Sequence, residues 1–160
     1  HPVELEWAGG TLAQGDPAYA REVERRIDTL GLTEHVRLLG PVPHDRMPEV
    51  FARSTAFLST SRTGSVDKVV LEAMATGRPA VTSNASFEWV FEPLGRELSE
   101  QLRFPEGDAG ALAARVEGLL ARGRVERDAL GRELRSLVEE RHEVDRLMQR
   151  LVEAMEGPRP

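Results

Sequence analysis

Short apolar segments alternate with amphipathic segments along the first half of the chain, and no two-residue hairpin turn joins neighbouring apolar segments. Strands connected in this way pair in parallel, because a helix between them supplies the long crossover that parallel pairing needs. The pattern therefore predicts an α/β fold, in which helices cover both faces of a doubly wound parallel sheet. The expected strands are residues 3–8, 36–39, 55–59 and 79–83, with a further short strand ending at Phe104.

Several of the expected helices begin or end at characteristic residues. Asp16 and Pro17 suit the N-cap and first turn of the first helix, and Gly31 suits its end. Asp45 and Asp108 are N-cap candidates for later helices. In the first helix, apolar residues recur at intervals of three and four, which is typical of a helix with one buried face. The expected helices are residues 17–30, 46–52, 66–76, 109–121, 124–141 and 143–156.

Length and composition limit the classes of function. The 160 residues correspond to about one domain, which we assign to residues 1–156, with a frayed tail at 157–160. Without a membrane-length apolar run, the chain is expected to be cytoplasmic. Zero cysteines and four scattered histidines do not indicate a metal site. A net charge of −6 gives no general attraction to nucleic acid or anionic membranes, so we expect a small-molecule or protein partner.

The N-terminal residues suggest that more polypeptide precedes them. The chain starts with His1 and Pro2 and reaches an expected strand within a few residues. A natural protein seldom starts in the middle of its sheet. We therefore expect that the chain is an excised piece of a longer polypeptide. The alternative is a whole protein whose first residues are the scar of a trimmed tag.

The loop at residues 60–67 is the most informative candidate site. In open parallel sheets, ligands bind where the carboxyl ends of strands meet helix N-termini. Gly64 and Ser65 come directly before an expected helix, whose first N–H groups have no partner within the helix and can bind an anion. Arg62 and Lys68 add positive charge that suits a phosphate or diphosphate. Two other loops, residues 9–16 and 40–44, carry glycine and polar residues after strands.

A purely structural interpretation of this loop stays open. Ser65 would then cap a core helix, and Asp67 would complement the helix dipole. Lys68 and Glu72 are four residues apart and would form an ordinary helical ion pair, worth roughly 0.2 to 0.5 kcal/mol.

Glu72 is the acid that this structural interpretation explains least well. It stands on an expected helix that is otherwise apolar on nearly all sides. A carboxylate in such surroundings needs hydrogen-bond donors, because burial without a partner costs several kcal/mol. A ribose offers two adjacent hydroxyl groups. Phosphate at the helix start and ribose one to two turns along form a spacing that a nucleoside diphosphate spans.

With these residues in view, the chain closely resembles the C-terminal, donor-binding domain of family 4 (group 1) glycosyltransferases, retaining enzymes of the GT-B fold. The resemblance extends over nearly the whole chain and is strongest in "VRLLGPVP" and "LEAMATGRPAV". The other matching segments, in order, are "AGG", "DPAY", "LGL", "AFLSTSRTG" and "FPEGDAGALAARVEGLL". The resemblance implies a Rossmann-like half of a GT-B fold.

The resemblance also implies roles for individual residues. Glu72 matches the second of two motif glutamates and would bind the ribose hydroxyls of a nucleotide-diphospho-sugar donor. The first motif glutamate, which approaches the sugar, is replaced by Gly64, and Asp67 or Lys68 could substitute for it. The loop amides that hold the diphosphate would come from Ser65, Val66, Asp67 and Lys68, the base would meet Pro41 and Val42, and Gly9 and Gly10 would border the same cleft.

A second departure from the family concerns the segment before residue 1. The family's C-terminal domain begins one βα unit earlier, with a motif whose arginine and lysine clamp the diphosphate. The acceptor-binding N-terminal domain is also missing here. The resemblance therefore implies that this fragment binds donor but does not catalyse, and that its main partner is the missing domain. No cofactor or metal is implied, and membrane association of the parent protein is not encoded in this chain.

The function implied for the parent is retaining transfer of a sugar to an acceptor, in glycan or glycolipid synthesis. One alternative is a GT-B sugar-nucleotide epimerase, which needs further acid and base residues near the sugar. Another is a degenerate, non-catalytic nucleotide-binding or interaction module, as the absent glutamate at Gly64 would suggest. A dehydrogenase-type fold is disfavoured, because the Gly-x-Gly-x-x-Gly fingerprint is absent.

Overall fold

The computed structural model describes residues 3–9 and 17–157, which group into two compact units. The first unit covers residues 1–47 and the second covers residues 48–160. Each unit is described by itself. The expected N-cap Asp16 and the expected frayed residues 158–160 lie outside the described residues. The single domain assigned to residues 1–156 stays a prediction.

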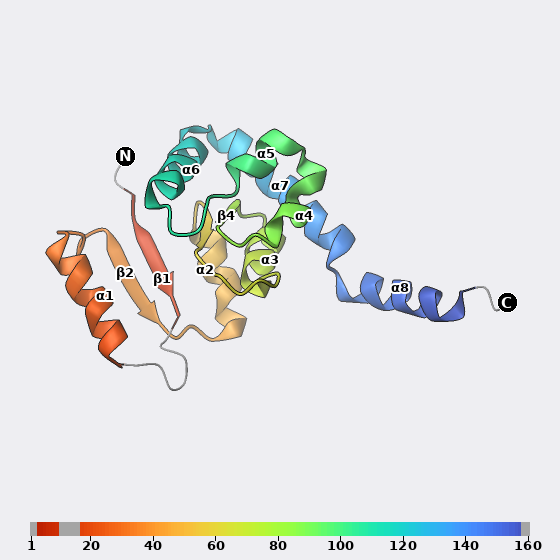
Figure 1. Cartoon of the computed structure of the whole chain (residues 1–160), viewed down its shortest axis with the longest axis horizontal. Helices are drawn as coiled ribbons and strands as arrows, with labels where there is room; N and C mark the ends of the chain where they lie inside the picture. The colour runs from red at the N-terminus through yellow and green to blue at the C-terminus, as the bar shows by residue number, and fades with distance from the viewer. Residues whose placement is uncertain (1–2, 10–16, 158–160) are drawn as a thin grey trace. The chain divides into compact units, whose positions relative to one another are not determined.

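The first unit is a βαβ crossover. Strand β1 (Leu5–Ala8) and strand β2 (Val36–Gly40) pair in parallel, with Leu5 opposite Val36 and Trp7 opposite Leu38. Helix α1 (Pro17–Thr29) connects them, and the 3₁₀ turn η1 (His44–Arg46) follows (Figure 1). Gly31 adopts a φ of +67°, and the N–H of Leu32 donates to the carbonyl of Ile27 at 2.9 Å. The predicted end of this helix is therefore confirmed.

The second unit contains another parallel pair, β3 (Phe57–Ser59) and β4 (Ala80–Thr82). Thr82 also bridges to Arg103, because the N–H of Phe104 donates to the Thr82 carbonyl at 3.2 Å. The strand expected at Phe104 is thus present as a single parallel bridge. The helices of this unit are α2 (Met47–Arg53, beginning at the unit boundary), α3 (Lys68–Ala75), α4 (Phe87–Phe91), the 3₁₀ turn η2 (Glu92–Leu94), α5 (Arg96–Gln101), α6 (Ala109–Ala121), α7 (Arg124–Arg141) and α8 (Val144–Glu156).

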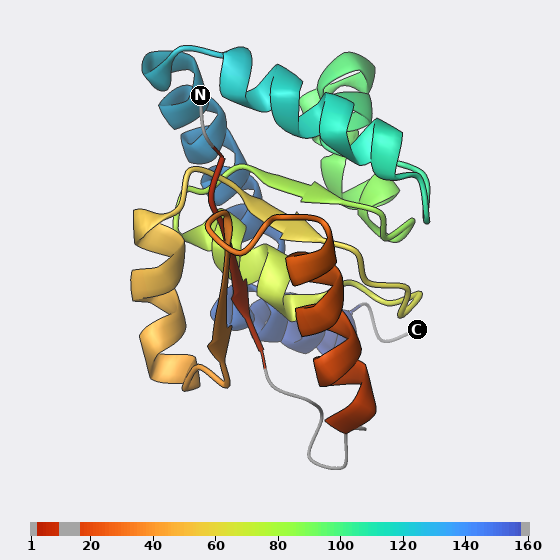
Figure 2. The same cartoon turned by 90° about the vertical axis from the view of Figure 1, so that its left-hand side faces the viewer.

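Helices cover both faces of the β3–β4 pair. Helix α6 lies on one side and α3 on the other, and α7 packs against α3 (Figure 2). Val70 and Met74 of α3, Phe87 and Phe91 of α4, and Leu134 of α7 are fully buried in the shared core. Each such side chain stabilises the fold by about 1.5–3 kcal/mol. The predicted α/β class with parallel strands between helix layers is confirmed in this unit.

Some element boundaries differ from those predicted. Helix α3 begins at Lys68 with Asp67 at its N-cap, so the expected start at Val66 is wrong, and Ser65 does not have the N-cap position that the purely structural interpretation gives it. Asp45 lies inside η1 and does not cap α2. Asp108 does cap α6, because its Oδ1 accepts from the N–H of Ala111 at 2.8 Å.

Three short helical segments between residues 87 and 101 were not predicted. They have five, three and six residues, which is too short for a helical period to show in the sequence. Pro93 lies in the first turn of η2, and Gly95, with a φ of +82°, separates η2 from α5, because neither residue continues an α-helix easily.

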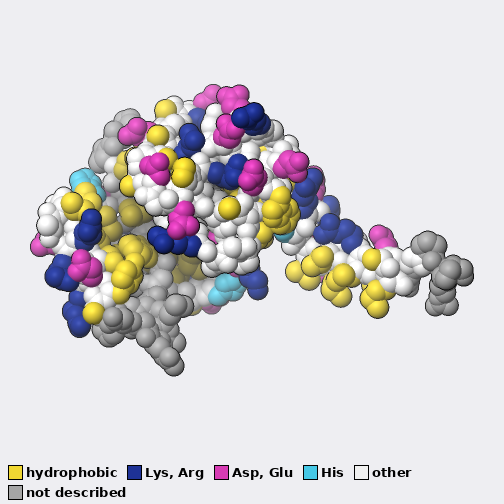
Figure 3. Space-filling model, viewed as in Figure 1, with side chains coloured by type: hydrophobic (Ala, Val, Ile, Leu, Met, Phe, Trp, Pro, Cys, Tyr) yellow, Lys and Arg dark blue, Asp and Glu magenta, His cyan; other side chains and the backbone are white. Residues whose placement is uncertain are grey.

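Helix α8 presents an apolar face to solvent, visible as one row of hydrophobic side chains in Figure 3. Glu143 caps the N-terminus of this helix, because its carboxylate accepts from the N–H groups of Asp145 and Arg146, each at 3.0 Å. Within the described part of the chain, no helix combines the length and apolar character needed to cross a membrane. The exposed apolar residues are Val144, Leu147, Met148, Leu151, Val152 and Met155.

The close approach of α7 to the end of α3 depends on Gly131. A Cβ built there would lie 2.1 Å from the carbonyl oxygen of Gly77. We expect Gly131→Ala to lower the free energy of unfolding by about 1–3 kcal/mol, measured by urea denaturation. The control is Gly118→Ala in α6, where nothing lies within 4 Å and a gain of about 0.5–1 kcal/mol is expected. Equal effects of the two substitutions would contradict this packing.

His142 makes stability depend on pH. Its Nε2 is buried without a hydrogen-bond partner among the described residues, and its ring centroid lies 5.7 Å from that of Trp89. Burial, together with the charges of Arg141 and Arg150, lowers the pKa of His142 below its usual value. The unfolded chain therefore takes up the proton first, so this contribution is present above about pH 6.5 and is lost as the pH falls.

We therefore expect the urea midpoint to fall from pH 7.5 to pH 5.5, and His142→Gln to flatten this dependence. The carboxyl groups of Glu100 and Glu143 also have a lowered pKa, but stability linked to them is lost only at more acidic pH. His44→Gln, at an exposed histidine of η1, serves as the control. A pH dependence that survives unchanged in His142→Gln would show that other groups cause it.

Candidate functional site

The loop between β3 and α3 is held by Asn84, which follows β4 and is 3% exposed. Its Nδ2 donates to the carbonyl of Ser65 at 2.7 Å and to Oδ2 of Asp67 at 3.0 Å. Its Oδ1 accepts from the N–H of Ser86 at 2.9 Å. A buried amide with both ends hydrogen-bonded fixes the loop, because loss of any partner would leave a polar group unsatisfied.

Asp67 completes this network from within the loop. Its Oδ1 accepts from the hydroxyls of Thr63 at 2.9 Å and Ser61 at 3.1 Å, in addition to the Asn84 contact. The carboxylate is thus satisfied by three protein donors. Gly64 turns the chain with a φ of +69°, and its carbonyl accepts from the Ser86 hydroxyl at 2.9 Å. Most other residues would be strained at this φ.

The network leaves a run of backbone donors free. None of the N–H groups of residues 64–69 donates to an acceptor among the described residues. They precede or begin the first turn of α3, where the helix dipole favours negative charge. Successive free amides at a helix start form an anion-binding arrangement. Ser65, Val66, Asp67 and Lys68, the predicted diphosphate contacts, all lie in this run.

Glu72 lies one turn further along α3 and is partly buried. Its carboxylate has no hydrogen bond or ion pair with any described residue. The Lys68–Glu72 ion pair of the purely structural interpretation is therefore absent, and Lys68 is exposed without an ionic partner among the described residues. Glu72 is thus available to a ligand, and its ribose contact stays a prediction.

The other predicted contacts fall in the first unit. The N–H of Gly9 donates to the Gly40 carbonyl at 2.9 Å, which brings the carboxyl ends of β1 and β2 together. Pro41 and Val42 follow directly after β2, with Pro41 exposed and Val42 partly buried. Gly10 lies outside the described residues. The roles assigned to these residues stay predictions.

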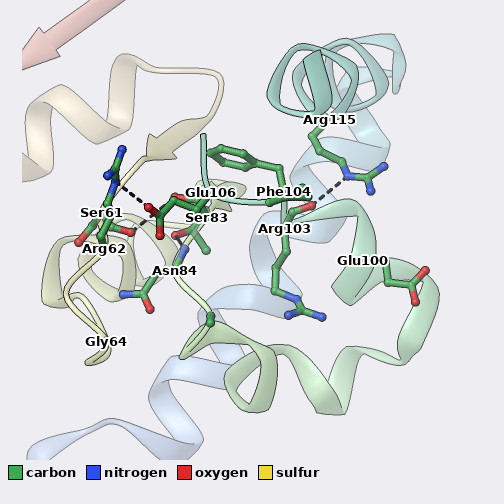
Figure 4. A pocket seen from close by; sticks show the side chains of 13 residues that line it. Ser61, Arg62, Gly64, Ser83, Asn84, Glu100, Arg103, Phe104, Glu106 and Arg115 are labelled. Atoms are coloured by element: carbon green, nitrogen blue, oxygen red, sulfur yellow. Dashed lines mark hydrogen bonds and ion pairs between the residues drawn. The ribbon is translucent and has the colours of Figure 1, made fainter. Parts of the chain in front are cut away.

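A pocket of about 610 Å³ opens at the carboxyl ends of β3 and β4 (Figure 4). Of the predicted site residues, Arg62 and Gly64 line it, whereas Glu72 and residues 65–68 do not. The other lining residues come from the β3 loop, from the segment after β4, from residues 100–106 and from α6. They are Ser61, Thr82, Ser83, Asn84, Ala85, Glu100, Arg103, Phe104, Pro105, Glu106 and Arg115.

Charged groups gather at both ends of this pocket, as Figure 4 shows. At one end, Nε of Arg62 lies 3.1 Å from Oε1 of Glu106. At the other end, Nε of Arg115 donates to the Arg103 carbonyl at 2.9 Å, and Arg103 pairs with Glu88 at 3.4 Å. The described residues contain no group of three or more His, Asp or Glu side chains arranged to hold a metal ion.

Sequence reasoning missed Asn84, Arg103 and Glu106. The signal for Asn84 was present, because it comes just after an expected strand, where ligand loops occur in open α/β sheets. Glu106 gave no such signal, since its contact with Arg62 joins residues 44 positions apart.

Comparison with known proteins agrees with this fold. One curated relative, mannosylfructose-phosphate synthase of Agrobacterium fabrum, is 25% identical over 81 residues, which are 51% of this chain and 18% of the relative. Sucrose-phosphate synthase from Thermosynechococcus elongatus superposes with a TM-score of 0.70 at 22% identity, over 94% of this chain and 39% of that one. The catalytic domain of cholesterol-α-glucosyltransferase from Helicobacter pylori gives a TM-score of 0.64 at 16% identity, over 88% of this chain and 99% of that one.

These structural similarities show a common fold, that of a GT-B half-domain. The chain spans less than half of the length of the first two relatives. The family itself is shown by sequence, because residues 2–122 match the family described as glycosyl transferases group 1. That match covers most of the 160 residues, and the chain belongs to the group 1 glycosyl transferases.

Proposed function

We propose that the second unit binds the nucleoside diphosphate of an activated-sugar donor, as the donor-binding half of a longer, retaining glycosyltransferase. Family membership supports the reaction class. Two neighbouring features of the loop and α3 carry the proposal. The N–H groups of residues 64–69 are free, and the carboxylate of Glu72, one turn further along, has no partner among the described residues. Retention of configuration and the glycan or glycolipid acceptor come from the family resemblance.

The spacing of these groups suits this ligand. Lys68 and Glu72 are four residues apart on α3, which places them about 6 Å apart along the helix axis. A diphosphate on the amides would therefore leave its ribose within reach of the Glu72 carboxylate, which accepts hydrogen bonds from hydroxyl groups. Glu72 would then gain the donors that the protein does not supply.

The same amides would assist transfer in the complete enzyme. Negative charge develops on the departing diphosphate when the sugar bond breaks. Amides that the Asn84 network holds in place, with the exposed Lys68 beside them, would stabilise this charge without reorganising. Acceptor binding is assigned to a separate N-terminal domain, so the chain alone is expected to bind donor without transferring sugar.

A non-catalytic nucleotide-binding module is the second candidate, and Gly64 is the observation that favours it. The family resemblance places a glutamate near the sugar at this position, and here the residue has no side chain. Both candidates require nucleotide binding, and they differ in whether the complete protein turns over a nucleotide sugar.

Thermal shift and calorimetry of the full-length protein with UDP, GDP and ADP test the proposal. At least one nucleotide should raise the melting temperature, because a ligand that binds only the folded state stabilises it. Glu72→Ala should weaken binding of that nucleotide about 10- to 100-fold, as expected for lost hydrogen bonds to a charged group. Inorganic diphosphate should bind both proteins equally, since it has no ribose.

Glu117→Ala, at an exposed glutamate of α6, is the matched control and should leave nucleotide affinity unchanged. Stabilisation by none of the three nucleotides would refute donor binding. Equal nucleotide affinity of Glu72→Ala and the unmodified protein would refute only the role of Glu72.

A further inference from the structure

We propose that Glu106, held by Arg62, supplies the carboxylate that contacts the donor sugar, in the pocket at the carboxyl ends of β3 and β4. This inference rests on the proposed function, because it takes the diphosphate to lie on the amides of residues 64–69. It assigns to Glu106 a contact that neither the family resemblance nor the sequence motifs attribute to it.

The pocket adjoins the amide run. Gly64 belongs to both, since it lines the pocket and begins the run of free amides. Ser61 and Arg62, from the same loop, also line the pocket. A group attached to the outer phosphate can therefore enter the pocket while the diphosphate stays on the loop. A volume of about 610 Å³ is ample for one hexose.

The lining has the chemistry that a sugar needs. The hydroxyl groups of Ser61 and Ser83 donate to Asp67 and to the Ser61 carbonyl, and their oxygens can still accept hydrogen bonds from a sugar. The pair of Arg62 and Glu106 adds charged donors and acceptors. Phe104 gives an apolar surface beside them. Sugars combine hydroxyl groups with C–H faces, so they can use both kinds of surface.

Other carboxylates near the pocket are less suited to this contact. The position at which the resemblance expects a glutamate is Gly64, which has no side chain, and its φ of +69° disfavours other residues there. Asp67 is already satisfied by Ser61, Thr63 and Asn84 and does not line the pocket. Glu100 lines the far end and is paired with Arg96 at 2.8 Å. Among the described residues that line the pocket, Glu106 is thus the carboxylate that pairs with the loop after β3, through Arg62.

Glu106 is oriented and still available. Its Oε1 lies 3.1 Å from Nε of Arg62, and its Oε2 has no partner among the described residues. Its side chain is 56% exposed, and an ion pair so exposed contributes little to stability. Arg62 therefore engages only one oxygen of the carboxylate, and Oε2 can accept a hydrogen bond from a sugar hydroxyl.

The test compares each nucleotide sugar with its free diphosphate: UDP-glucose with UDP, GDP-mannose with GDP, and ADP-glucose with ADP. Affinities are measured by calorimetry for the full-length protein, Glu106→Ala and Glu106→Gln. Glu106→Ala should weaken binding of the nucleotide sugar about 10-fold and leave that of the free diphosphate unchanged. Glu106→Gln should lose less, because its amide oxygen still accepts hydrogen bonds.

Glu97→Ala, at an exposed glutamate of α5 outside the pocket, is the control and should change neither affinity. Melting temperatures without ligand check that each variant is folded. If folded Glu106→Ala and Glu106→Gln bind the nucleotide sugar as the unmodified protein does, the role of Glu106 is refuted while diphosphate binding stands. If neither diphosphates nor nucleotide sugars bind the unmodified protein, the proposed function fails, and this inference fails with it.

Discussion

The buried amide of Asn84 is the interaction on which the site depends. It joins the segment after β4 to the loop after β3 through the Ser65 carbonyl and the Asp67 carboxylate. Asp67 in turn gathers Ser61 and Thr63. Because these side chains satisfy one another, the loop keeps its shape without using its own amides, which remain free for an anion.

Because of this arrangement, the carboxylates near the loop have two different roles. Asp67 stabilises the loop, whereas Glu72 and Glu106 keep oxygens for a ligand. The free amides lie between them in the proposed binding order of ribose, diphosphate and sugar. The loss of a side chain at Gly64 then need not remove carboxylate recognition of the sugar, because Glu106 reaches the same pocket from a different segment of the chain.

The sequence predicted what depends on local pattern. Alternating apolar segments gave the parallel strands and most helices, and Asp108 was recognised as a cap because its contact spans three residues. The purely structural interpretation placed the N-cap of α3 at Ser65, whereas Asp67 occupies that position. The hydrogen bond from Asn84 to Asp67 joins residues 17 positions apart and leaves no local signature in the sequence. Glu72 could be found because its apolar neighbours lie beside it in the sequence. The pairing of Glu106 with Arg62 joins distant segments, so only the fold shows it.

Hydrogen exchange of the full-length protein, followed by mass spectrometry, tests most directly whether the fixed loop binds the diphosphate. Exchange is compared without ligand and with saturating nucleoside diphosphate. We predict slower exchange at residues 64–69 on binding, and a smaller effect in Asn84→Ala, whose loop is no longer held. Nucleotide binding that protects other segments and leaves the exchange of residues 64–69 unchanged would contradict the account.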